Sequence, residues 1–171
     1  FFDYSFREKD LERPPVENFR TISLQFIDSF LEEEKKLRKD FKEERFETVL
    51  SALPSLQERA GMLGHAIEEK KGEGTETVRL LESFCEALYQ LHSALIALSA
   101  SSSTNEQKKQ KEILNAKKYL RSIGGILKKI AIEARKELKR QVVFLPHSVK
   151  HFGSLRPLID RLLEREDMEV K

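Results

Sequence analysis

Two pairs of residues in the chain have types and spacings that could support chemistry. His147 and His151 are four residues apart, which places two imidazoles on one face of a helix, as in many metal sites. The sequence offers no Glu-x-x-His motif and no third ligand beside them, so we expect no metal ion. Cys85 and His92 are seven residues apart on one helical seam. Two helical turns separate such positions by about 10 Å, beyond hydrogen-bond reach, so we predict that Cys85 is a buried small apolar residue.

The glycines and carboxylates give no better sign of catalysis. Gly72 and Gly74 do not form a phosphate-binding loop, because no Gly-Lys-Ser/Thr sequence follows them and no strand is predicted before them. The runs rich in Glu have the spacing of solvated faces of amphipathic helices. We therefore expect no catalytic residues, no metal, no cofactor and no small-molecule substrate, and we predict that the protein is not an enzyme.

Composition indicates a soluble helical protein. The 171 residues suffice for one domain with a hydrophobic core. Charged residues make up 35% and hydrophobic residues 39%, with 7 Gly, which argues against a disordered chain and against a Gly-rich sandwich or barrel. The single Cys excludes a disulfide framework, and no apolar run is long enough to span a membrane. The first residues do not have the pattern of a signal peptide, so we expect a cytoplasmic piece of a longer protein.

Apolar residues recur at helical intervals in the first third of the chain. Phe19, Phe30 and Phe41 are 11 residues apart, which keeps an apolar stripe on one face of a nearly straight helix. The pattern predicts a first long helix over about 15–53 that Pro54 ends or kinks, with a break near Asp40 as an open alternative.

The rest of the chain continues the helical pattern. A second helix is expected to stop at the glycines within 71–74. A third, over about 76–100, is apolar around much of its circumference and is the expected centre of the bundle. A heptad pattern predicts a second long helix over about 104–143, in which Gly124 and Gly125 mark either close helix packing or a bend.

We therefore predict an all-α fold, an elongated bundle of four to five helices with two long helices. Residues 1–14, with four aromatic side chains, would form an N-terminal arm that either folds across the bundle or belongs to an interface. Residues 15–145 would form the bundle. Residues 146–171 would form a short turn, broken by Gly153, and a C-terminal helix capped by Ser154 that packs on the bundle or continues from it.

The positive charge is concentrated on the last long helix. Residues 101–143 contain 12 basic and 4 acidic side chains, whereas the whole chain has a net charge of only +2. The heptad pattern places many of these basic groups opposite the core seam. The residues that we expect to contact an anionic partner are Arg121, Lys128, Lys129, Arg135 and Lys136.

Two interpretations of this basic face remain open at this point. It could be a solvated helix face, beside which acidic groups of the first helix lie. It could instead dock an anionic surface. The acidic groups concerned are Glu32, Glu33, Glu34, Glu43 and Glu44.

Three functions follow from these alternatives. The leading hypothesis is a non-catalytic helical protein–protein interaction or scaffold domain of a larger protein, with another protein or a second copy as partner. The alternative is a domain that binds anionic surfaces, either the nucleic-acid backbone or an acidic membrane, through the basic face of the helix over 104–143. A third hypothesis is a module that senses a ligand or signal in a cavity of the bundle core.

Overall fold

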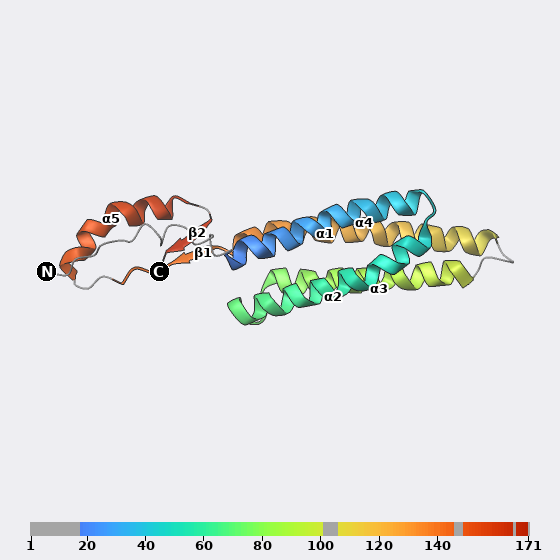
Figure 1. Ribbon diagram of the computed structural model, residues 1–171, viewed down its shortest axis with the longest axis horizontal. Coiled ribbons are helices and arrows are strands. Elements are labelled where there is room, and N and C mark those ends of the chain that lie inside the picture. Colours follow the sequence, from blue (N-terminus) through green and yellow to red (C-terminus); the bar gives the residue numbers. More distant parts are fainter. Residues whose placement is uncertain (1–17, 101–105, 146–148, 166, 171) are drawn as a thin grey trace, which may run out of the picture.

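Four helices pack side by side, each antiparallel to the next (Figure 1). The computed structural model describes residues 18–100, 106–145, 149–165 and 167–170. Contacts between α1 and α2, α2 and α3, α3 and α4, and α4 and α1 close the bundle. The all-α bundle predicted from the sequence is confirmed. The four helices are α1 (Phe19–Lys42), α2 (Phe46–Lys71), α3 (Glu76–Ala100) and α4 (Glu106–Glu137).

The core consists of the apolar stripes that the sequence periodicity predicts. Phe30 of α1 and Phe84 of α3 are almost fully buried, and the centroids of their rings are 5.8 Å apart. Burial of such side chains is the main source of stability in a bundle of this size. The other large side chains with the lowest exposure are Ile27, Leu53, Leu56, Ile67, Leu81, Leu88, Leu91, Leu95, Ile123 and Leu127.

The first long helix predicted over about 15–53 is two helices, and this boundary was wrong. The chain reverses at 43–45, where Glu44 has a positive φ of 56°. Arg45 pairs with Asp40 across the turn, and the rings of Phe41 and Phe46 pack edge to face with their centroids 5.2 Å apart. The break near Asp40, left open above, is therefore the one that occurs.

Pro54 does not end a helix, because α2 continues through it to Lys71. Proline lacks the N–H that would bond the carbonyl four residues earlier, but Pro54 is exposed, so water can satisfy that carbonyl. The predicted stop within 71–74 is confirmed. Gly72 and Gly74 adopt φ values of 87° and 83°, which only glycine reaches without strain.

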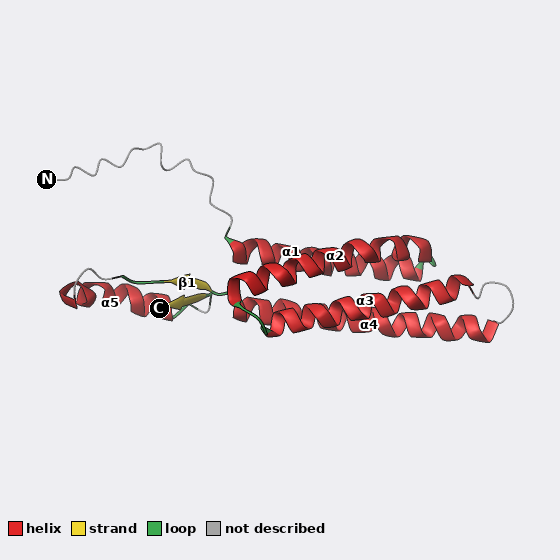
Figure 2. Cartoon of the chain, turned by 90° about the horizontal axis from the view of Figure 1, so that it is seen from below, coloured by secondary structure: helices red, strands yellow, loops and turns green. Residues whose placement is uncertain are grey.

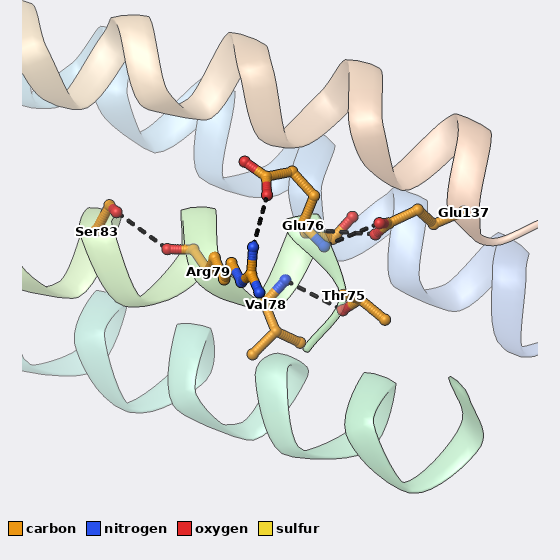
Figure 3. A network of polar contacts seen from close by, with 7 residues as sticks. Thr75, Glu76, Val78, Arg79, Ser83 and Glu137 are labelled. Carbon is orange, nitrogen blue, oxygen red and sulfur yellow. Dashed lines mark hydrogen bonds and ion pairs between the residues drawn. The ribbon is translucent and has the colours of Figure 1, made fainter. Parts of the chain in front are cut away.

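The last residue of α4 caps the first turn of α3 (Figure 3). The carboxylate of Glu137 accepts hydrogen bonds from the backbone N–H groups of Glu76, at 2.9 Å, and Thr77, at 3.0 Å. Partial burial is the largest single influence and raises the pKa of Glu137. The hydrogen bonds from Thr77 and Glu76, with the charge of Lys71, outweigh it and hold that pKa below its ordinary value. One acidic side chain thus ties the end of α4 to the start of α3.

The second long helix is shorter than the predicted 104–143 at its C-terminal end. After α4 ends at Glu137, a three-residue strand follows, β1 (Arg140–Val142), which pairs in parallel with β2 (Met168–Val170). Neither strand is predicted by the sequence pattern, which favours helix up to about residue 143. Parallel pairing joins segments far apart in the chain, and local periodicity does not reveal it.

Helix α5 (Val149–Leu163) connects the two strands and contacts β2. It begins before Gly153 and includes Pro157, so the predicted turn up to Gly153 and the cap at Ser154 were wrong. Gly153 and Pro157 are both exposed, which lessens the free-energy cost of placing a glycine and a proline inside a helix. In both overall views α5 and the strands lie beyond one end of the bundle (Figure 2).

The predicted N-terminal arm, residues 1–14, lies outside the described residues. Within the part of the chain that is described, no helix combines the length and the apolar character that crossing a membrane requires.

Candidate anionic-partner surface on helix α4

The five basic residues predicted to contact an anionic partner are exposed on α4. Arg121, Lys128 and Lys129 lie near the middle of the helix. Arg135 and Lys136 lie in its last turn, with side chains 55% and 62% exposed. The helix positions them because its opposite side is held in the core by Leu120, Ile123, Leu127 and Ile130.

Ion pairs divide this set into two groups. Arg135 lies 3.8 Å from Asp28 of α1, and Lys136 lies 2.7 Å from Glu133 one turn earlier. Among the described residues, the other three basic groups (Arg121, Lys128, Lys129) have no ion-pair partner. The middle of α4 therefore carries positive charge that the fold does not neutralise.

The acidic groups of the first helix do not lie beside this unpaired charge. Glu34 pairs with Arg38 on its own helix, and Glu33 pairs with Arg59 of α2. Glu32 pairs with Lys35 at 2.7 Å, and that hydrogen bond, aided by their opposite charges, lowers the pKa of Glu32. In the turn after α1, Glu43 pairs with Arg45. The interpretation of the basic face as one neutralised by its neighbour helix is therefore not supported by the ion pairs.

Of two adjacent glycines in α4, one faces the core and the other faces solvent. Gly124 is buried, and a Cβ atom built there would lie 2.6 Å from Oε1 of Glu34 and would also clash with Arg38. Gly125 is exposed, and a Cβ there would meet nothing within 4 Å. The predicted close packing at the glycines thus occurs at Gly124 alone, against an ion pair of α1.

Sequence reasoning missed two aliphatic side chains on the same surface. Leu114 is 68% exposed and Ile132 is 53% exposed. They are 18 residues apart, which is five turns at 3.6 residues per turn, so they lie on one line along the helix. Arg121 and Gly125 fall close to this line, while Lys128 and Lys129 flank it on opposite sides. The signal was present in the sequence as two apolar residues opposite the core seam.

We define the α4 outer face by the residues of this line and its flanking cations. It combines isolated aliphatic contacts with unpaired positive charge. Its members are Leu114, Lys117, Lys118, Arg121, Gly125, Lys128, Lys129, Ile132, Arg135 and Lys136.

A groove of about 610 Å³ between α2 and α3 is a second candidate site. Gly61 and Cys85 are among its lining residues, together with His65. Burial raises the pKa of the Cys85 thiol, and the negative charge of Glu82 raises it further. A thiol in this state is a poor nucleophile at neutral pH, so the groove gives no support to nucleophilic chemistry.

No protein family, curated protein sequence or solved structure with which the chain was compared matches it. The side chains of the predicted His147–His151 pair lie outside the described residues. Elsewhere in the described part of the chain, no three His, Cys, Asp or Glu side chains form a cluster that could hold a metal ion.

Proposed function

We propose that the chain is a non-catalytic helical interaction domain that docks an acidic partner protein on the α4 outer face. The observation that carries the proposal is the exposed, unpaired state of Arg121, Lys128 and Lys129 among the described residues. Like charges on one surface repel one another and lower stability slightly, so an acidic partner would gain both direct attraction and relief of that repulsion.

The exposed aliphatic residues favour a protein over the other anionic partners. Leu114 and Ile132 offer apolar contacts that a phosphate backbone cannot use. They are also too few and too far apart for the continuous apolar face with which amphipathic helices enter a membrane surface. A partner helix with acidic residues beside a narrow apolar line would match both features, as in the flanking charges of a coiled-coil seam.

The test compares three anionic probes across a salt series. Binding to poly-L-glutamate, double-stranded DNA and phosphatidylcholine–phosphatidylglycerol vesicles is measured from about 50 to about 500 mM salt. We expect poly-L-glutamate to bind, with affinity that falls as salt rises. Tighter binding of DNA or of vesicles than of poly-L-glutamate would contradict the assignment of an acidic protein and favour the corresponding anionic surface. Absence of binding to all three at the lowest salt would contradict the proposal as a whole.

A matched pair of charge reversals assigns the binding to the surface. Lys128→Glu/Lys129→Glu should weaken poly-L-glutamate binding by about tenfold or more. Lys35→Glu/Lys36→Glu makes the same change in net charge at two exposed lysines of α1 and should weaken it by about twofold at most, through net charge alone. Equal loss in both double variants would mean that binding follows net charge and not the α4 outer face.

A further inference from the structure

A basic pocket lies where α1 begins and α4 ends. It has a volume of about 510 Å³, which lies within the range of small-molecule sites. Arg20 comes from the first turn of α1, Arg135 and Lys136 from the last turn of α4, and Lys139 from the segment after it. Asp167, next to β2, is the one acidic residue among the described residues that line it. Among the described residues that line the pocket, four are therefore cationic and one is a carboxylate.

The acidic groups near the pocket already have partners. Asp167 accepts two hydrogen bonds from Arg165, at 3.0 and 3.1 Å. Arg135 is 3.8 Å from Asp28, and Lys136 is 2.7 Å from Glu133. Two cations remain, Arg20 and Lys139, and neither has an ion-pair partner in the described part of the chain.

Arg20 is the residue that a purely structural explanation does not account for. Basic residues at the end of α4 are favoured by the negative end of its helix dipole, which explains Arg135 and Lys136. Arg20 instead lies at the start of α1, where the dipole is positive and where three other cations are close. Its Nε atom is buried and, among the described residues, has no hydrogen-bond acceptor. Arg20 also has no ion-pair partner among the described residues, so neither the helix dipole nor an ion pair explains a cation at this position of the pocket lining.

We propose that this pocket binds the phosphoryl group of a small soluble ligand. A phosphoryl group presents several acceptor oxygens and up to two negative charges, which suits a guanidinium and an ammonium group that line one pocket and have no ion-pair partner among the described residues. The pocket is larger than one phosphoryl group, so there is room for the rest of a small phosphorylated molecule. The site is separate from the middle of the α4 outer face, and only Arg135 and Lys136 belong to both.

The test uses inorganic pyrophosphate as the probe and isothermal titration calorimetry on the full chain. We expect saturable binding that Arg20→Gln/Lys139→Gln weakens by about tenfold or more, because both unpaired cations are lost. The matched control Lys35→Gln/Lys36→Gln removes the same charge from two exposed lysines of α1, outside both proposed sites, and should change the affinity by about twofold at most. An equal loss in both variants, or no saturable binding by the wild-type chain at millimolar pyrophosphate, would overturn the proposal.

Two additions keep the result interpretable. Lys139→Gln alone alters a half-buried residue outside the helices, so it tests the site even if the change at Arg20 impairs folding. Circular dichroism of each variant without ligand establishes whether it is folded. Phosphatidic acid vesicles distinguish the source of the phosphoryl group, since tighter binding to vesicles than to pyrophosphate would overturn a soluble ligand in favour of a lipid headgroup. The variants leave Arg135 and Lys136 unchanged, although these two residues belong to both sites. A negative result here would therefore not contradict the proposed docking surface on α4.

Discussion

The inner and outer faces of α4 are made of adjacent residues, yet they differ in whether charged side chains on or against them have ion-pair partners. On the inner side, Gly124 is buried under the Glu34–Arg38 ion pair of α1. On the outer side, Gly125 is exposed and Lys128 has no ion-pair partner within the described residues. The inner face is thus determined by packing, and charge that reaches it is neutralised.

This difference separates the residues that folding requires from the residues that remain available for binding. Core packing demands particular apolar volumes and small residues on the inner face. The outer face needs only helix-forming, soluble residues, and a mixture of acidic and basic side chains would satisfy that need. The excess of unpaired cations there is therefore not explained by folding, which is the reason for assigning it to binding.

The largest contrast is expected between Leu127 and its neighbour Lys128. Leu127→Ala removes a fully buried side chain and should lower the free energy of unfolding by about 3 kcal/mol. Lys128→Ala should change it by about 0.5 kcal/mol at most. Urea denaturation followed by circular dichroism measures both. A loss above about 1 kcal/mol for Lys128→Ala, twice the limit expected for a surface residue, would mean that the outer face is structural.

The buried ion pair on the inner face should give the next largest effect. Glu34 is 8% exposed, and Glu34→Gln would leave the guanidinium of Arg38 without its carboxylate, lowering stability by about 2 kcal/mol. Glu32→Gln is the control, because Glu32 forms an exposed pair with Lys35 and its loss should produce no measurable change. Equal midpoints of urea denaturation for the two variants would show that burial does not strengthen the inner pair.

Substitution of the two adjacent glycines by alanine should change the free energy of unfolding in opposite directions. Gly125→Ala gains helix propensity without a clash and should stabilise the protein by about 1 kcal/mol. Gly124→Ala gains the same propensity but displaces Glu34 and Arg38, for a net loss of about 1 kcal/mol. Thermal and urea denaturation of both variants provide the measurement. Stabilisation by both substitutions would contradict the close contact at Gly124.

Glu137 is expected to give an effect no larger than those of the two glycines, and one that depends on pH. Its pKa is lowered in the folded state, so its contribution is fully present above the ordinary value of 4.5 and is lost as pH falls through the lower folded pKa. Glu137→Gln should therefore cost about 1 kcal/mol at neutral pH and progressively less in acid. Glu106→Gln, at an exposed residue of α4, is the control. A cost for Glu137→Gln that does not change with pH would contradict the role of its charge.

Sequence periodicity predicted the bundle and the buried face of each helix, because apolar spacing follows directly from helix geometry. It placed Arg121, Lys128 and Lys129 on the outer face for the same reason. It offered a break near Asp40 only as an alternative to one long helix, since a positive φ at a non-glycine residue such as Glu44 depends on tertiary contacts. Nor could it predict that Arg20 and Lys139 line one pocket, because spacing within one segment does not reveal which residues of another segment lie beside it.

The most direct test of the account is a map of where an acidic polypeptide binds. Backbone amide shifts of the ¹⁵N-labelled chain are recorded during titration with poly-L-glutamate. We predict that the largest changes occur along the α4 outer face, centred on Arg121, Lys128 and Lys129, and that they disappear as salt is added. Changes centred on the α2–α3 groove, or spread evenly over the basic residues of the whole chain, would contradict the assignment of α4 as the docking surface.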